Sequence, residues 1–145
     1  MTPYFEYRHV VGLEETNVVG NAYFAHFVRW QGRCREMFLA ERAPGVIAEL
    51  GDGLKIFTLA SSCEYLAEVF AFDTLAIRMR LAELTQTQVA FTFDYVRLRD
   101  EAEEPVASGQ QRVLCMRAGE SGMQPVRVPS CLRQALAPFQ AGGGR

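Results

Sequence analysis

The chain is predicted to fold as one α+β domain, in which an antiparallel five-stranded sheet wraps around one long helix. A short aromatic and β-branched segment opens the chain, a long segment with apolar residues at helical spacing follows, and four segments with strand character complete it. Consecutive strands favour antiparallel pairing, and the apolar stripe of the helix must be buried against one sheet face. With 145 residues, 49% of them hydrophobic, the chain can bury a core without disulfides.

The first half of the chain predicts a strand over residues 4–11 and then the long helix. Asn21 is expected to cap this helix. The helix should stop before Pro44, and residues 44–50 predict a short second helix that ends in a Gly-Asp-Gly turn. One apolar stripe is formed by Tyr23, Phe27, Trp30, Cys34 and Met37, and it is broadened by Phe24, Val28 and Phe38.

The second half is mostly β. Strands are expected over residues 56–65, 75–81, 88–98 and 106–116, with apolar and other residues alternating most clearly in the second and third of them. Residues 129–139 predict a terminal helix. We therefore expect a single domain over residues 1–138 and a flexible tail over residues 139–145.

Composition excludes several classes of function. The net charge of −2 gives no electrostatic footprint for nucleic acid or for an anionic membrane. No CxxC pair and no zinc-spaced histidines occur, so we expect no metal site and a cytoplasmic protein with reduced thiols. No segment looks like a signal peptide or a membrane span. Only His9 and His26 are histidines, and the absence of G-x-S-x-G argues against a classical serine hydrolase.

Residues 14–35 are the most informative stretch, because a polar loop passes through Gly20 and Asn21 and opens directly into the long helix. A helix N-terminus presents unpaired backbone N–H groups and a partial positive charge. Such a place suits a carbonyl oxygen that becomes an oxyanion during a reaction. We therefore expect any chemistry to lie at this junction.

The order of the elements, together with E-E-T-N-V-V-G-N, R-W-Q-G-R-C-R-E and F-D-Y-V-R-L, resembles the hotdog fold in its 4-hydroxybenzoyl-CoA thioesterase-like branch. Within that branch it resembles the thioesterases that accompany enediyne polyketide synthases, over about residues 4–138. The resemblance implies hydrolysis of a polyene β-ketoacyl thioester from the acyl-carrier domain of an iterative synthase, with decarboxylation of the released β-keto acid. It also implies a substrate carried on phosphopantetheine and no further cofactor. Because hotdog sheets pair, it implies a homo-oligomer, a dimer at least and a tetramer by expectation.

The chain departs from many relatives of this branch in having Asn17 where they carry an aspartate that serves as nucleophile or general base. An amide cannot accept a proton from water at neutral pH. Asn17 is instead able to donate a hydrogen bond to an oxyanion or to orient a water, although a plain loop-capping role is the alternative. The enediyne thioesterases are known for this missing carboxylate.

Arg35 is the second candidate catalytic residue, because it matches an arginine that is widespread in the branch. It follows Asn21 by 14 residues, about 21 Å along a straight helix. It therefore either buttresses the loop, through backbone carbonyls or Glu36, or serves a site built partly by a neighbouring subunit. Structural and catalytic roles both remain open for it.

The predicted mechanism needs no side-chain nucleophile. The thioester carbonyl would accept hydrogen bonds from Asn17 and from backbone N–H groups of residues 20–22, while water attacks and Arg35 steers the product carboxylate. Glu15 or a main-chain carbonyl is a candidate for orienting the water, with a solvated loop charge as the alternative reading of Glu15. The candidate substrate-binding residues are Gly20, Asn21, Tyr23, Phe27 and Thr58.

Two rival functions remain at the level of the sequence. A general acyl-CoA thioesterase is disfavoured by the absence of aspartate at position 17. A non-hydrolytic acyl-binding partner of a polyketide synthase is compatible with the missing general base.

Overall fold

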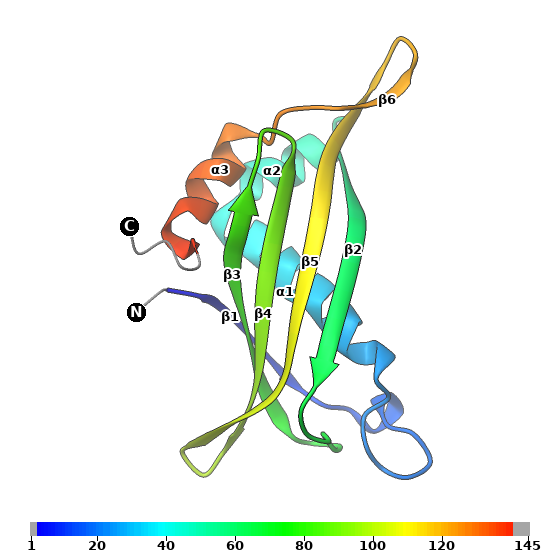
Figure 1. Cartoon of the computed structure of the whole chain (residues 1–145), viewed down its shortest axis with the longest axis vertical. Coiled ribbons are helices and arrows are strands. Elements are labelled where there is room, and N and C mark those ends of the chain that lie inside the picture. The colour runs from blue at the N-terminus through cyan, green and yellow to red at the C-terminus, as the bar shows by residue number, and fades with distance from the viewer. Residues whose placement is uncertain (1–2, 141–145) are drawn as a thin grey trace.

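The computed structural model of the chain describes residues 3–140. Its strands are β1 (Phe5–Val10), β2 (Lys55–Tyr65), β3 (Thr74–Leu84), β4 (Gln88–Arg99), β5 (Ala102–Gly119) and β6 (Gly122–Pro125). They form one antiparallel sheet in the order β1-β3-β4-β5-β2, with β6 paired to β5. The long helix α1 (Ala25–Arg42) runs along one face of this sheet (Figure 1). The predicted fold class is confirmed, with β6 as an additional sixth strand.

The helix α1 begins later than predicted. Asn21 does not cap it, because Asn21 forms an isolated β-bridge with Phe70, and the residue before the helix is Phe24. Tyr23 and Phe24, predicted as part of the buried stripe, are exposed, and Val28 is half-buried, whereas the remainder of the stripe faces the core. The buried apolar positions of α1 are Phe27, Trp30, Cys34, Phe38 and Leu39.

The helix α1 ends before Pro44, as predicted, because proline lacks the N–H group that would continue the helix. A second helix, α2 (Pro44–Leu50), follows at once. The C-terminal segment forms α3 (Ser130–Leu136) and a 3-10 turn, η2 (Ala137–Phe139). Phe139, which the predicted tail includes, is buried in the core, so the domain extends past residue 138. Residues 141–145 of that tail lie outside the described residues.

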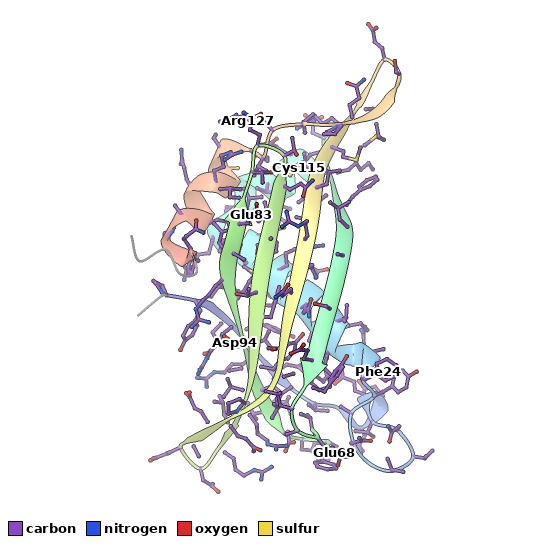
Figure 2. The ribbon with its side chains drawn as sticks, viewed as in Figure 1. Phe24, Glu68, Glu83, Asp94, Cys115 and Arg127 are labelled. Carbon is purple, nitrogen blue, oxygen red and sulfur yellow. The ribbon has the colours of Figure 1, made fainter. Side chains whose placement is uncertain are left out.

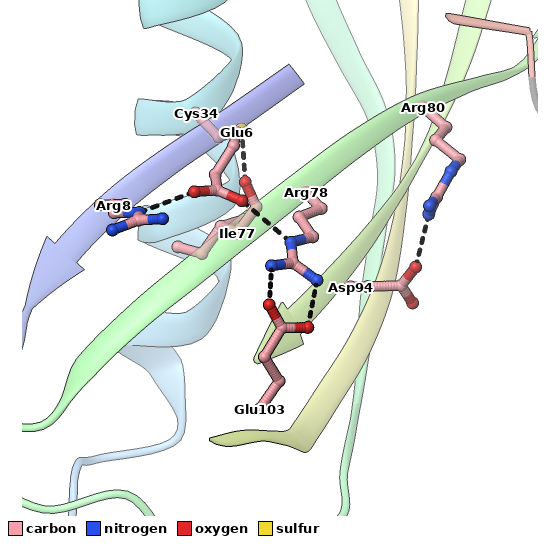
Figure 3. A network of polar contacts seen from close by, with 8 residues as sticks. All are labelled: Glu6, Arg8, Cys34, Ile77, Arg78, Arg80, Asp94 and Glu103. Carbon is pink, nitrogen blue, oxygen red and sulfur yellow. Dashed lines mark hydrogen bonds and ion pairs between the residues drawn. The ribbon is translucent and has the colours of Figure 1, made fainter. Parts of the chain in front are cut away.

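The sheet has an apolar face toward α1 and a polar outer face. Along β3, Leu75, Ile77, Met79 and Leu81 are buried, while Arg78 and Arg80 point outward, as Figure 3 shows. Ion pairs join the strands across this outer face, among them three that Figure 3 draws. These three are Arg78 with Glu6 at 2.9 Å, Arg78 with Glu103 at 2.8 Å and Arg80 with Asp94 at 2.7 Å.

The turn between β2 and β3 contains a bulky residue in the left-handed region. Phe72 has a φ of 73°, its side chain is 68% exposed, and its N–H donates to the Val11 carbonyl at 2.7 Å. Because a non-glycine residue is strained at this φ, we expect Phe72→Gly to raise the free energy of unfolding by about 0.5–1 kcal/mol. Chemical denaturation checks this. The neighbouring Ala71→Gly, which has no strain to relieve, should lower stability, and equal losses for both variants would contradict the prediction.

Candidate functional site

The polar loop predicted to carry the chemistry is a closed structure at the start of α1. It follows a 3-10 turn, η1 (Leu13–Glu15), and is closed by a β-bridge between Thr16 and Ala22. At its tip, the Gly20 N–H donates to the Asn17 carbonyl at 2.9 Å, and Gly20 adopts a φ of 99°. Glycine takes this backbone conformation without a steric penalty, which explains its place in the turn.

Asn17 is exposed, and its side chain supports the turn. Its Oδ1 accepts a hydrogen bond from the Val19 N–H at 3.0 Å. Since a backbone N–H can only donate, this contact assigns the oxygen to the loop and leaves the Nδ2 group pointing away from it. The loop-capping role and the oxyanion-donor role therefore use different atoms of Asn17 and are compatible.

Glu15 is buried, which makes its reading as a solvated loop charge wrong. Its side chain accepts hydrogen bonds from Trp30 Nε1 at 3.0 Å, from the Gly12 N–H at 3.0 Å and from His9 Nε2 at 2.8 Å. Burial alone would raise the pKa of this carboxyl, but the three hydrogen bonds outweigh it and hold the pKa below its ordinary value. The carboxylate thus fastens the loop to β1 and α1, and both of its oxygens are engaged within the protein.

Of the backbone donors predicted at residues 20–22, two are engaged within the protein and one is free. The N–H groups of Gly20 and Ala22 donate to the carbonyls of Asn17 and Val69, at 2.9 Å and 2.6 Å. Within residues 3–140, the N–H groups of Phe24 and Ala25 have no hydrogen-bond acceptor, and no side chain caps this helix end. The Asn21 N–H likewise has no hydrogen-bond acceptor among residues 3–140, so the free donors for an oxyanion are the predicted Asn21 and, further along the chain, Phe24 and Ala25.

A small cavity of about 130 Å³ opens beside this helix start. Figure 2 places Phe24 and Glu68, two of its lining residues, at the same end of the molecule. Asn21 also lines the cavity, and its Oδ1 is buried without a hydrogen-bond partner among the described residues. The other lining residues are Ala22, Phe27, Tyr65, Ala67 and Val69. Of the predicted binding residues, Asn21 and Phe27 thus line the cavity, while Tyr23 and Gly20 lie in the loop segment next to it.

Two tyrosine hydroxyls fix the first turn of α1. Tyr65, at the end of β2, donates to the Phe24 carbonyl at 3.0 Å, and Tyr95 of β4 donates to the Phe27 carbonyl at 2.5 Å. Burial raises the pKa of Tyr65 to about 12, so its hydroxyl remains a donor at neutral pH. The exposed backbone donors are therefore carried on a helix end that two strands hold in place.

Removal of the Tyr65 hydroxyl tests this arrangement. Tyr65→Phe is expected to lower the free energy of unfolding by about 1 kcal/mol and to slow thioester hydrolysis several-fold, because the helix end loses one anchor. Denaturation curves and hydrolysis rates measure the two effects. The matched control is Tyr4→Phe, since Tyr4 packs its ring against Arg78 on the outer face, far from the helix start. Equal rates for both variants would show that the Tyr65 hydroxyl has no role in the site.

Arg35 and Thr58 form a second group, away from the loop. Arg35 Nη1 donates to Gln111 Oε1 at 2.7 Å and to Thr58 Oγ1 at 3.4 Å. No hydrogen bond joins Arg35 to the loop or to Glu36 within the described residues, so the expected loop buttress is wrong. Burial lowers the pKa of the Arg35 guanidinium, which has no carboxylate within ion-pair distance in residues 3–140. One subunit thus does not bring Arg35 and Asn17 together.

Four contributors to these two groups were not predicted from the sequence. Gln31 and Gln111 are buried polar residues, at 0% and 5% exposure, that face each other between α1 and β5. Their signal was a polar side chain at a position where the helical or strand period calls for an apolar one. Tyr65 and the backbone of Phe24 had no such signal, because their roles depend on tertiary contacts.

A hollow of about 470 Å³ lies across β2, β3, β4 and β5 and takes no lining residue from the loop or from α1. It therefore contributes nothing to the site at the helix start. In residues 3–140, no three His, Cys, Asp or Glu side chains gather as metal ligands would. No helix in the same part of the chain is both long and apolar enough to cross a membrane.

Comparisons with known proteins identify the family. Residues 11–136 match the thioesterase-like superfamily. The dynemicin thioesterase, whose structure concerns induced-fit and allosteric effects upon polyene binding, is 46% identical over 95% of this chain and 98% of its own, with a TM-score of 0.92. No curated protein matches the chain significantly.

Two further structures share the fold at low identity. A 1,4-dihydroxy-2-naphthoyl-CoA thioesterase from Synechocystis is 21% identical over 92% of this chain and 95% of its own, with a TM-score of 0.74. The 4-hydroxybenzoyl-CoA thioesterase from a Pseudomonas strain is 11% identical over 92% and 99%, with a TM-score of 0.76. The resemblance to the enediyne branch is confirmed by the dynemicin thioesterase. The chain belongs to the thioesterase-like superfamily and is a thioester hydrolase with the hotdog fold.

Proposed function

We propose that the protein hydrolyses a polyene β-ketoacyl thioester carried on the phosphopantetheine arm of the acyl-carrier domain of an iterative enediyne polyketide synthase. The observation that carries this proposal is the 46% identity, over 95% of the chain, to the dynemicin thioesterase, a protein described with bound polyene. The aromatic walls of the cavity at the helix start, Phe24, Phe27 and Tyr65, suit a flat conjugated chain.

The geometry supports a mechanism without a side-chain nucleophile. Asn17 Nδ2 and the free N–H groups at residues 24 and 25 hold the thioester oxygen as it becomes negative, and one such donor contributes about 3 kcal/mol at the transition state. Water attacks the carbonyl, and phosphopantetheine leaves as the thiol. The released β-keto acid is intrinsically prone to lose carbon dioxide, with Arg35 steering its carboxylate. We expect no metal or redox cofactor to be needed.

A homo-oligomer, at least a dimer and by expectation a tetramer, belongs to this proposal. Among residues 3–140, the strand β2 pairs with β5 on one side only, and Phe57 and Leu59 on it are 44% and 48% exposed. A free, partly apolar strand edge of 11 residues is normally covered in native proteins. A second copy on this edge would bring another loop toward the Arg35 side of the sheet. The protein would then act in the cytoplasm beside the synthase.

The test is product release from a synthase loaded with its β-ketoacyl chain, compared with the hydrolysis of medium-chain and aromatic acyl-CoA. We expect release of the β-keto acid or its decarboxylated ketone, at a kcat/KM well above that for acyl-CoA. Faster turnover of acyl-CoA would instead identify a general acyl-CoA thioesterase. Binding of the chain without release would overturn hydrolysis of this substrate.

A further inference from the structure

The interior between α1, β2 and β5 contains a row of polar side chains, and two of them, Gln31 and Gln111, have no part in the proposed mechanism. Gln31 Nε2 donates to the Ser62 carbonyl at 2.9 Å, Gln111 Nε2 donates to Gln31 Oε1 at 3.4 Å, and Arg35 Nη1 donates to Gln111 Oε1 at 2.7 Å. Both glutamines are buried, at 0% and 5% exposure. The row therefore connects a strand carbonyl to the guanidinium of Arg35 through two amides enclosed by the core.

Chemistry at the two ends of the row determines how both amides are oriented. The Ser62 carbonyl can only accept, so Gln31 must turn its N–H group toward it and its oxygen toward Gln111. The Arg35 guanidinium can only donate, so Gln111 must turn its oxygen toward Arg35 and its N–H group toward Gln31. Reversing either amide would set donor against donor or oxygen against oxygen in a buried place. One orientation is therefore favoured at every link.

The backbone of β5 is shaped to admit this row. A Cβ at Gly109 would overlap Gln31 Nε2 and would lie 2.8 Å from the Ser62 carbonyl oxygen. Gly109 and Gln111 are two residues apart on β5 and both point toward α1. A glycine at this position thus gives Gln31 the space to reach β2, which indicates a built feature rather than incidental contacts.

The row leaves the charge of Arg35 available. Its partners, Gln111 and Thr58, are neutral, and both use Nη1, so Nε and Nη2 have no partner within residues 3–140. A carboxylate at position 111 would hold the guanidinium equally well but would neutralise it. Arginine presents Nε and Nη2 as a planar pair of donors that matches two oxygens of one anionic group.

We propose that Gln31 and Gln111 are positioning residues, whose directed amide row holds Arg35 with its Nε and Nη2 donors aimed at the oxygens of the β-ketoacyl chain that become negative during the reaction, the carboxylate of the released acid among them. This inference rests on the proposed function, because it assigns Arg35 a ligand in that reaction. Gln111 acts through Arg35 and does not touch the chain itself. Its removal should therefore matter only while Arg35 is present.

The test combines product release from the loaded synthase with nitrogen NMR of the Arg35 guanidinium, whose signals are assigned by their loss in Arg35→Ala. Gln111→Met keeps the volume of the side chain and removes the acceptor. We expect Gln111→Met to free the rotation of the guanidinium, so that the separate Nη signals merge into one. We also expect it to slow release of the chain about 10-fold or more. In the Arg35→Ala background the same substitution should have no further effect on release.

The matched control is Gln110→Met, because Gln110 is the exposed neighbour on β5 that faces the opposite side of the sheet. It should leave both the Arg35 signals and the release rate at wild-type values. If Gln111→Met does not fold, Gln31→Met tests the same row one link further away. Gln111→Glu separates the position of Arg35 from its charge, because the carboxylate still holds the guanidinium but neutralises it. The rotation of the guanidinium should therefore stay restricted, while release of the chain still slows.

Two results would overturn the proposal. In the first, the rotation of the Arg35 guanidinium is as restricted in Gln111→Met as in the wild-type protein. Where Gln111→Met does not fold, the same result in Gln31→Met counts. In the second, Gln111→Met slows release as much without Arg35 as with it. Failure of the wild-type protein to release the chain would count against the proposed function instead, and the NMR comparison would still decide whether the row positions Arg35.

Discussion

Asn17→Ala is expected to slow release of the β-ketoacyl chain about 100-fold, because one side-chain donor to the oxyanion is lost. The effect should appear mainly in kcat, since the oxygen is negative only in the transition state. Single-turnover release from the loaded synthase measures it, with folding checked by circular dichroism. The turn contact from Val19 to Oδ1 is lost as well, so a second variant has to separate the two roles of Asn17.

Asn17→Asp makes that separation, because its carboxylate still accepts the Val19 N–H but has no N–H group to donate. We expect a loss about as large as that of Asn17→Ala, roughly 100-fold, in a protein whose loop is intact. The control is Val18→Thr, because threonine has nearly the shape of valine and Val18 is fully exposed in the same loop. Full activity in Asn17→Asp would mean that a carboxylate can run the reaction here, and the oxyanion-donor role of Asn17 would have to be abandoned.

Glu15→Gln is expected to lower the free energy of unfolding by roughly 3 kcal/mol at pH 7. The side chain keeps its shape, but its new N–H group must face one of the donors of Trp30, Gly12 or His9. Urea denaturation compares it with Glu14→Gln, the neighbouring exposed carboxylate, which should change stability little. A loss below that of Glu14→Gln would show that the buried carboxylate does not hold the loop.

The same carboxylate predicts a pH dependence. The pKa of Glu15 lies below its ordinary value of 4.5 in the folded protein, so its contribution to stability is present above pH 4.5. That contribution is lost as the pH falls through the lower, folded-state pKa. Glu15→Gln has no proton to bind, and its stability should therefore fall less steeply on the acid side. Parallel pH profiles for the two proteins would contradict the assignment.

The elements of the fold were accessible to sequence reasoning, whereas their tertiary connections were less so. The period of two in Leu75, Ile77, Met79 and Leu81 defines a strand with one buried face, and Pro44 limits α1, because both are local effects. The helix α1 begins later than its sequence predicts, since the Asn21–Phe70 bridge that keeps residue 21 out of the helix joins distant segments. The missed strand β6 begins at a glycine with a φ of 109°, in a segment whose composition suggests only turns.

In the candidate site, too, the features with local signals could be predicted from the sequence, whereas those that depend on tertiary contacts could not. The loop was found because Asn17, Gly20 and Asn21 mark a turn before a helix, which is a local signal. The burial of Glu15 depends on Trp30 and His9, which reach it from a helix and a strand. The partners of Arg35 lie on β2 and β5, so the direction of its side chain could not follow from helical spacing alone.

The order of the strands has a consequence for how the protein folds. The strands β3, β4 and β5 are neighbours both in the chain and in the sheet, whereas β1 and β2 pair with β3 and β5 across longer stretches. Closing a longer loop loses more chain entropy, so we expect the local hairpins to form first. The loop, α1 and β2, which surround the candidate site, all belong to the half of the chain that is synthesised first. This half must keep its aromatic helix face uncovered until the central hairpins have emerged from the ribosome, which makes synthesis the period of greatest aggregation risk.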